Sequence, residues 1–273
     1  MMSSSLMNFD PKYRVAPMAP CSQDEFEHKH YHQPQLIQGQ ALAWPAMRKW
    51  TFGFFREHFG NDDVMVTNHS EQKTVRLADY LDYLEREDES ESPYYLTNWL
   101  FYRDHPELRQ DYKAPAMFRD YLSPVVSQQD LLTWIYIGGK GSFSSVHIDV
   151  YQTPAWNGLI CGTKLWAFYS PLQTALMGEG EVNTFCPDLL SHPSFAQARP
   201  YIIIQKPGDV VYSPPGWWHQ VINLEATISV TENFVDRLSA ANVCQILENE
   251  HGLGVLAKSI RTRVMADAPG VSS

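Results

Sequence analysis

Eight short apolar runs between residues 131 and 235 constrain the fold more than any other feature of the chain. They are rich in Val, Ile, Tyr, Phe and Trp, which suit a pleated, half-buried surface. Breaks such as Pro207-Gly208-Asp209 and Pro214-Pro215-Gly216 separate them. The predicted strands are Leu132–Ile137, Ser145–Val150, Ala155–Cys161, Lys164–Ser170, Tyr201–Gln205, Asp209–Ser213, Trp218–Asn223 and Thr227–Phe234. The pattern predicts a mainly β fold, a closed or sandwich-like jelly-roll barrel of eight strands, rather than a parallel α/β sheet.

The regions on either side of this barrel are predicted to add helices and further strands. Ala46–Phe59 and Leu77–Glu87 have helical spacing, whereas Val64–Asn68 and Thr74–Leu77 indicate short strands that extend the sheet. We therefore divide the chain into a flexible, irregular lead-in at 1–40, mixed helices and strands packing on the barrel at 41–130, the barrel at 131–236, and C-terminal helices at 237–273.

The terminal regions leave two questions open. In the lead-in, a first edge strand is expected near Gln35–Gln38, and His28, His30 and His32 alternate as they would on one strand face. Three such histidines could bind a metal, but a solvated segment is the favoured interpretation because no supporting polar partners are visible. The C-terminal helices are expected to cap the barrel. Their apolar positions could also form a homodimer face, made of Val243, Ile246, Leu247, Leu256 and Ile260.

His147, Asp149 and His219 are the candidate metal ligands. Residues i and i+2 of a strand project from the same face, so His147 and Asp149 could grip one ion together, and a jelly roll would bring His219 to the same mouth. Two histidines and one carboxylate form a face that suits non-haem Fe(II) with open positions. A histidine and an aspartate two residues apart are weak evidence alone, because a hydrogen-bonded structural cluster can have the same residues at the same spacing.

Composition narrows the class of protein further. The formal charge of −10 argues against nucleic acid as the main ligand and is compatible with a basic protein substrate. No apolar stretch reaches the length of a membrane span, and the first residues resemble no secretion signal. The four cysteines form no Cys-x-x-Cys pair, which indicates reduced thiols rather than a zinc site. We therefore expect a cytoplasmic protein.

With the strands and ligands placed, the segment from about residue 93 to 236 resembles the jumonji-C branch of the Fe(II)- and 2-oxoglutarate-dependent oxygenases. The matching motifs are Ser145–Asp149 (SVHID), Ala155–Asn157 (AWN), Gly162–Trp166 (GTKLW), Gln205–Asp209 (QKPGD), Pro214–His219 (PPGWWH) and Thr231–Phe234 (TENF). The chain is most similar to the small single-domain protein hydroxylases, including the jumonji-type lysyl hydroxylase. Pro187–Pro193 and Ala198–Pro200 also resemble the cupin-like subgroup. This resemblance implies a double-stranded β-helix, or cupin, barrel.

The resemblance also implies the ligands and their sites. Fe(II) would be held by His147, Asp149 and His219, and 2-oxoglutarate and O2 would be consumed with release of succinate and CO2. No further acid or base is required. The co-substrate residues implied by family position are Lys164, Thr231, Asn157, Ser144 and Tyr95. Lys164 would bind the distal carboxylate of 2-oxoglutarate, because an ammonium among aromatic residues is costly to bury without an anion.

These co-substrate residues also have ordinary structural interpretations. Lys164 could lie on an exposed edge strand, Thr231 could be a simple strand residue, and Asn157 beside a glycine suits a tight bend. Strict alternation along a strand points Ser144 away from the face that carries the first histidine. A bulge would be needed to turn its side chain toward the metal site. For Tyr95, the neighbouring tyrosine at 94 leaves the register open.

The substrate is the least constrained part of the hypothesis. Hydroxylation of a protein or peptide side chain is the first choice, because jumonji demethylases more often carry glutamate where this chain has Asp149. N-methyl-lysine demethylation, hydroxylation of a small metabolite or modified nucleoside, and a non-catalytic cupin-like binding protein are the alternatives. The segment 172–200 is expected to roof the site and to influence substrate choice.

Overall fold

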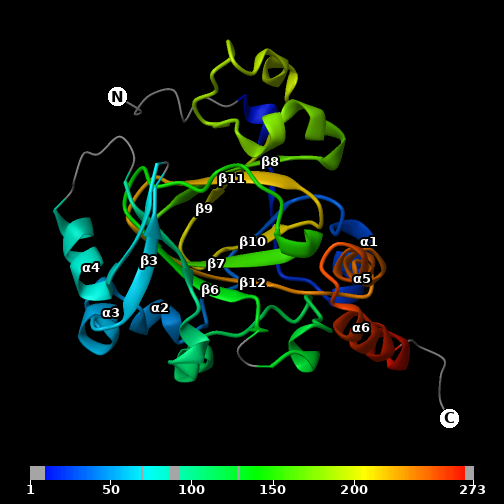
Figure 1. Cartoon of the computed structure of the whole chain (residues 1–273), viewed down its shortest axis with the longest axis horizontal. Coiled ribbons are helices and arrows are strands. Elements are labelled where there is room, and N and C mark those ends of the chain that lie inside the picture. Colours follow the sequence, from blue (N-terminus) through cyan, green and yellow to red (C-terminus); the bar gives the residue numbers. More distant parts are fainter. Residues whose placement is uncertain (1–9, 69, 87–92, 128–129, 268–273) are drawn as a thin grey trace.

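Two facing β-sheets form the centre of the protein in a computed structural model that describes residues 10–68, 70–86, 93–127 and 130–267 (Figure 1). The strands are β1 (Pro17–Met18), β2 (Gln35–Ile37), β3 (Asp63–Thr67), β4 (Gln72–Arg76), β5 (Tyr95–Trp99), β6 (Thr133–Gly138), β7 (Ala155–Cys161), β8 (Lys164–Tyr169), β9 (Tyr201–Gln205), β10 (Val210–Ser213), β11 (Trp218–Asn223) and β12 (Thr227–Asn233). The large sheet has the order β1-β2-β10-β7-β12-β6-β5-β3-β4, and the small sheet has the order β11-β8-β9.

The pairing of distant strands gives the jelly-roll arrangement that the sequence predicts. β7 lies between β10 and β12, and β8 lies between β11 and β9, all antiparallel. Seven of the eight predicted strands are therefore confirmed, with ends that shift by at most one residue or so. The predicted strand at 145–150 is wrong. The bridges here are isolated, Phe143 with Ile222 just before this segment and His147 with His219 within it, and the chain then enters a short 3-10 turn, η6 (Val150–Gln152).

Helices cover the large sheet on its outer side. They are α1 (Gln23–Lys29), α2 (Ala46–Lys49), α3 (Phe52–Phe59), α4 (Leu77–Glu85), α5 (Ala240–Asn249) and α6 (Gly254–Ala266). Fully buried residues such as Phe55, Leu77 and Ile137 belong to one apolar cluster between α2–α4 and the sheet. The single helix predicted at Ala46–Phe59 is two helices, because Thr51 adopts an extended conformation and its side chain caps the second.

The lead-in is more regular than the sequence analysis expected. Phe26 on α1 is 1% exposed and packs edge-on against Phe118 and Tyr212, so this part of the lead-in belongs to the main core. β2 is not an edge strand, because β1 pairs with it on one side and β10 on the other. The alternative in which a strand aligns three histidines is excluded, because His28 lies on the helix and His30 ends it. His28 and His32 are exposed, in line with the solvated segment that the sequence favours.

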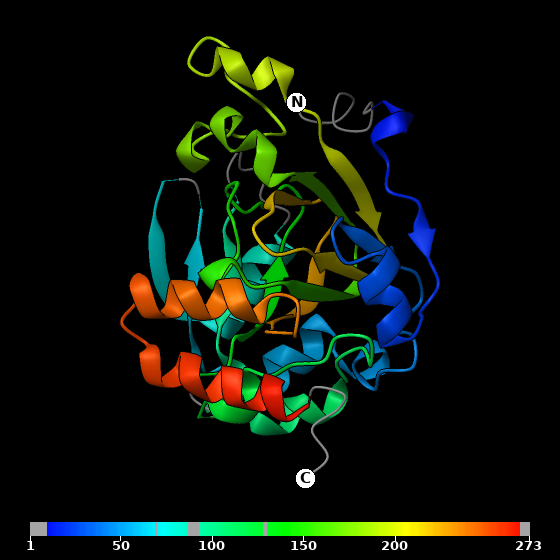
Figure 2. The ribbon, with the colours of Figure 1, turned by 90° about the vertical axis from the view of Figure 1, so that its right-hand side faces the viewer.

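The C-terminal helices pack side by side and close one end of the large sheet (Figure 2). Val243, Leu247 and Ile260 are almost fully buried against Tyr121 and Val235 of the body. The face predicted for dimerisation therefore lies mostly inside the chain. Of the helices in the described ranges, none combines the length and apolar character needed to cross a bilayer.

Segment 172–200 does not roof the cavity described below. It contains the 3-10 turns η7 (Pro171–Leu176), η8 (Gly178–Gly180) and η9 (Pro193–Gln197) and lies above the small sheet in Figure 1. Met177, Val182 and Phe195 pack on the outward side chains of β8, such as Ala167 and Tyr169. This cover explains why every residue of β8 is buried and why its inner face can hold a polar group away from water.

Candidate metal centre and co-substrate pocket

A cavity of about 340 Å³ lies between the two sheets. Every site residue proposed from the sequence lines it: Tyr95, Ser144, His147, Asp149, Asn157, Lys164, His219 and Thr231. No lining residue in the described chain comes from 172–200, so this segment does not form part of the cavity wall. The cavity thus gathers side chains from both sheets and from the irregular segment before β7.

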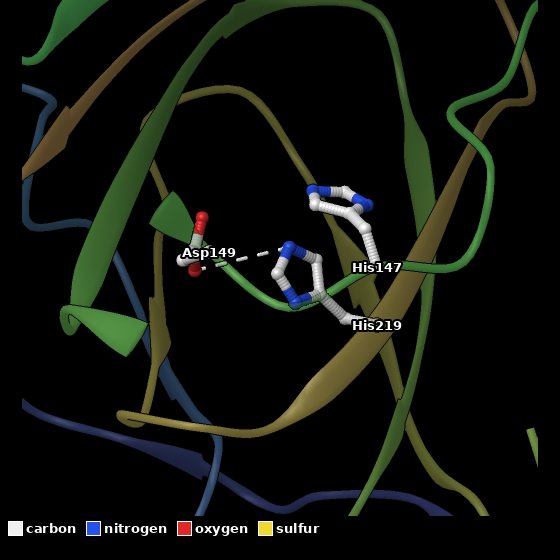
Figure 3. A group of neighbouring side chains, drawn as sticks. All are labelled: His147, Asp149 and His219. Atoms are coloured by element: carbon white, nitrogen blue, oxygen red, sulfur yellow. Dashed lines mark ion pairs between the residues drawn. The ribbon is translucent and has the colours of Figure 1, made fainter. Parts of the chain in front are cut away.

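His147, Asp149 and His219 point toward one another at this cavity (Figure 3). Each offers one ligand atom, and these atoms lie within 4.8 Å of one another. His219 Nε2 is 3.9 Å from an Asp149 oxygen, and the two imidazole centroids are 4.3 Å apart. Two nitrogens and one oxygen at this separation can share a single ion.

The two histidines are fixed by backbone hydrogen bonds. The N–H of His147 donates to the His219 carbonyl at 3.0 Å, and the N–H of His219 donates to the His147 carbonyl at 2.8 Å. The Nδ1 of His147 lies 2.8 Å from the Ser145 carbonyl, and the Nδ1 of His219 lies 3.3 Å from the Trp217 carbonyl. A carbonyl accepts from a protonated Nδ1, which leaves the Nε2 lone pair of each ring available to a metal.

Asp149 reaches the site from a turn rather than from a strand. It begins η6, and the two residues Tyr151 and Gln152 that follow have left-handed backbones with φ of 54° and 52°. Ser213 Oγ donates to Asp149 Oδ2 at 3.0 Å and orients the carboxylate. Sequence reasoning missed Ser213. Its place at the end of β10 would have identified it only once the pairing of β10 with β7 was known.

Burial sets the charge of the metal-facing histidine. His219 is 4% exposed, and its pKa is lowered to about 4 by loss of hydration and by repulsion from His147, with Asp149 acting in the opposite direction. At neutral pH the His219 ring is therefore neutral, which is the form that binds a metal.

Lys164 is the buried cation of the pocket. Its side chain is 1% exposed, and its Nζ donates to Tyr95 Oη at 2.7 Å and to Asn223 Oδ1 at 2.9 Å. Burial lowers the pKa of Lys164 to about 7. An ammonium has three donors, so one remains for a ligand after these two neutral oxygens are satisfied. Sequence reasoning missed Asn223, which pairs directly opposite Lys164 across β8 and β11.

Two other predicted residues line the cavity from different sheets, Thr231 on β12 of the large sheet and Ser144 beside β11 of the small sheet. Thr231 Oγ1 donates to the Trp156 carbonyl at 2.7 Å, and the N–H of Val221 donates to Ser144 Oγ at 3.2 Å. Ser144 faces the pocket because its segment is not a regular strand, so alternation gave the wrong orientation. Thr231 spends its hydroxyl proton on this backbone carbonyl and keeps lone pairs, whereas Ser144 accepts from a backbone N–H and keeps its own proton for a ligand.

Asn157 is the least satisfied polar group of the pocket. Its Nδ2 donates to Ser229 Oγ at 3.3 Å, while its buried Oδ1 has no partner within the described part of the protein. The two ends of an amide have nearly the same shape, and exchanging them lets Ser229 donate to the oxygen and turns the NH2 group toward the cavity. A buried donor that lines the same cavity as Lys164 fits a ligand carboxylate, since an unpaired buried polar group is costly.

β5 contributes a bulge at the mouth of the pocket. Its pairing with β6 shifts between Leu96 and Trp99, and the intervening Thr97 and Asn98 line the cavity. A bulge turns side chains away from the regular alternation of a strand and is common beside active sites. Tyr95, immediately before it, is the tyrosine that reaches Lys164, whereas Tyr94 bonds to Glu71 outside.

Comparisons with known proteins find relatives over most of the chain. The chain is 32% identical over 241 residues to "Lysine-specific demethylase JMJ21" of Arabidopsis thaliana, a match that covers 82% of this chain and 25% of the relative. It is 30% identical over 266 residues to "2-oxoglutarate and iron-dependent oxygenase JMJD4" of Gallus gallus, covering 83% and 62%. It is 28% identical over 225 residues to "Bifunctional arginine demethylase and lysyl-hydroxylase psr-1" of Caenorhabditis elegans, covering 74% and 55%.

The chain thus spans between a quarter and about three fifths of the length of these curated relatives. The name of the Gallus gallus relative confirms the resemblance to 2-oxoglutarate-dependent oxygenases that the sequence motifs indicate. Residues 23–239 match the family described as "Cupin-like domain", a range that includes all three ligand residues and every described strand except β1. The chain therefore belongs to the cupin-like domain family.

Proposed function

We propose that the protein is an Fe(II)- and 2-oxoglutarate-dependent oxygenase that hydroxylates a C–H bond of a protein or peptide side chain. The observation that carries the proposal is one cavity holding both a two-histidine, one-carboxylate cluster and a deeply buried lysine. When bound, iron, 2-oxoglutarate and O2 supply the oxidising chemistry, with succinate and CO2 as products.

The residues of the pocket divide this work between them. His147, Asp149 and His219 hold the iron, and Ser213 keeps the carboxylate oriented. Lys164 binds the distal carboxylate of 2-oxoglutarate, positioned by its bonds to Tyr95 and Asn223.

The remaining walls complete the co-substrate site. Asn157, Thr231 and Ser144 add polar contacts on the large-sheet side and at the entry. Trp166 and Phe168 stack with ring centroids 5.5 Å apart beside His219 and exclude water from the metal face.

A protein substrate is supported by the names of the relatives, which describe a lysyl hydroxylase and lysine- or arginine-specific demethylases. Those names also favour a second candidate, removal of an N-methyl group by the same site. The aspartate at position 149 keeps hydroxylation as our first choice. Small-metabolite turnover and a non-catalytic binding role remain outcomes of the experiment below.

The setting that we propose is cytoplasmic and without a nucleic-acid ligand. Cys21, Cys161, Cys186 and Cys244 are all free thiols, as a reducing compartment maintains them. The charge of −10 disfavours phosphate backbones. We keep residues 131–236 as the catalytic barrel and 237–273 as a C-terminal segment, and we keep a homodimer through this segment as part of the proposal.

The proposal is tested by turnover in a defined mixture. The protein is incubated with Fe(II), 2-oxoglutarate and a pool of peptides, and succinate and peptide masses are measured together. We expect succinate release with a gain of one oxygen mass on a peptide. Loss of a methylene mass with formaldehyde would establish demethylation instead, and a shift confined to metabolites would identify a small substrate. Absence of succinate in every pool, at saturating Fe(II), would contradict an oxygenase.

A further inference from the structure

The turn that follows the metal ligand Asp149 has a strained backbone. Tyr151 has φ 54° and ψ 19°, and Gln152 has φ 52°. In the described residues, the other non-glycine position with a positive φ is Glu179, which is exposed on the η7–η8 segment. Two consecutive L-residues in this conformation are uncommon and persist only where the surrounding structure holds them.

The C-terminal helices provide that hold. The Tyr151 ring packs edge-on against His251, just after α5, with centroids 4.8 Å apart, and it also packs on the apolar cluster beneath α5 and α6. Asn242 on α5 donates a long hydrogen bond of 3.4 Å to the Gln152 side chain. Figure 1 shows this green turn directly beside the orange helix α5.

The same turn is tied to the metal ligand on its other side. The N–H of Gln152 donates to the Asp149 carbonyl at 2.9 Å, and Thr153 Oγ1 donates to the Val150 carbonyl at 2.8 Å. Asn233 on β12 donates to Thr153 Oγ1 at 3.0 Å. The backbone that carries the Asp149 carboxylate is thus clamped between β12 and the C-terminal helices.

We propose that Tyr151 is a positioning residue, through which the α5–α6 hairpin fixes the Asp149 carboxylate in the metal centre. The inference rests on the proposed function only in taking the three ligand residues as a metal site. Without the packing on Tyr151, the turn relaxes toward ordinary right-handed or extended backbone and carries Asp149 away from the two histidines. The C-terminal hairpin, which touches neither metal nor co-substrate, thereby contributes to metal affinity.

Mn(II) binding by the full chain tests this inference without turnover. Mn(II) is titrated into each protein and the free ion is followed by electron paramagnetic resonance. We expect Tyr151→Ala to weaken Mn(II) binding roughly tenfold, which corresponds to about 1.4 kcal/mol. This is the smallest loss of metal affinity usual when a residue that orients a metal ligand is removed. Tyr151→Gly should weaken it less than Tyr151→Ala, because glycine adopts positive φ without steric cost.

The order of Mn(II) affinities of the two Tyr151 variants distinguishes a positioning role from a role in packing alone. Both substitutions delete the ring, and glycine loses more backbone entropy on folding, so a purely structural role would make glycine equal to alanine or worse. Glu179→Gly relieves a comparable backbone conformation at an exposed position that does not line the cavity, and it should leave Mn(II) affinity unchanged. His251→Ala, at an exposed position outside the turn, should weaken Mn(II) binding several-fold while the circular dichroism spectrum stays that of wild type.

The outcomes are distinct. Wild-type affinity in both Tyr151→Ala and His251→Ala, or tighter binding by the alanine than by the glycine variant, would overturn the inference and leave the proposed function standing. Failure of the wild-type protein itself to bind Mn(II) would overturn both. If Tyr151→Ala does not fold, the His251→Ala result decides.

Discussion

The protonation of Lys164 gives the most specific prediction for the co-substrate site. The buried ammonium has a pKa lowered to about 7, because Tyr95 and Asn223 offer neutral oxygens and no charge in compensation for lost hydration. A bound carboxylate supplies that charge and raises the pKa of Lys164. Above pH 7, binding of 2-oxoglutarate must therefore be accompanied by uptake of one proton.

The size of the effect follows from linkage. Below the pKa of the ligand-free protein, Lys164 already carries its proton and affinity is independent of pH. Above it, each further unit lowers the protonated fraction tenfold. Between about pH 6 and about pH 8 the protonated fraction falls from roughly nine tenths to roughly one tenth, so the dissociation constant of 2-oxoglutarate should rise about tenfold.

Isothermal titration of 2-oxoglutarate into Mn(II)-saturated protein measures this constant. Lys164→Met should weaken binding by about 2–5 kcal/mol, the cost of deleting one partner of a buried charge pair, and should abolish the pH dependence. Lys206→Met, which changes an exposed lysine that bonds to Thr163, is the matched control and should keep both affinity and slope. A flat profile in the wild type, or an unchanged slope in Lys164→Met, would refute the reasoning.

Three further predictions concern the ligands, their support and the core. His147→Ala and Asp149→Ala should each abolish Fe(II)-dependent succinate formation but leave the far-ultraviolet circular dichroism intact; turnover in both would reject the metal assignment. Ser213→Ala should weaken Mn(II) binding roughly tenfold, since it removes the hydroxyl that orients Asp149; an unchanged titration would make that contact incidental. Phe26→Ala should cost about 3–5 kcal/mol of unfolding free energy in urea, because the ring is 1% exposed; a loss below about 1 kcal/mol would return α1 to a loosely attached lead-in.

The strands were readable from the sequence because apolar runs and turn residues encode them locally. The backbone conformation that places Asp149 in the site could not be read in this way. Strand alternation predicts that His147 and Asp149 share one face, and the structure does bring them together, but through an isolated bridge and a left-handed turn. That conformation is imposed by contacts with distant helices, and no local signal at Tyr151 or Gln152 announces it.

One other difference between the predicted and the observed structure did have a signal in the sequence. Ser22 caps helix α1, because its hydroxyl accepts from the Glu25 N–H at 3.2 Å, and the spacing Ser-x-x-Glu is a known helix-start pattern. The alternating histidines nearby suggested a strand and concealed it. Ser213 and Asn223 could not be identified as site residues from local sequence, since their roles depend on which strands pair across the sheets.

A crystal of the protein grown with Mn(II) and 2-oxoglutarate, with anomalous diffraction recorded at the manganese edge, tests the central assignment most directly. The account predicts one strong anomalous peak bonded to His147 Nε2, His219 Nε2 and a carboxylate oxygen of Asp149, with electron density for the dicarboxylate extending from the ion to Lys164. A peak bonded to other side chains, or no peak in this cavity at saturating Mn(II), would contradict it.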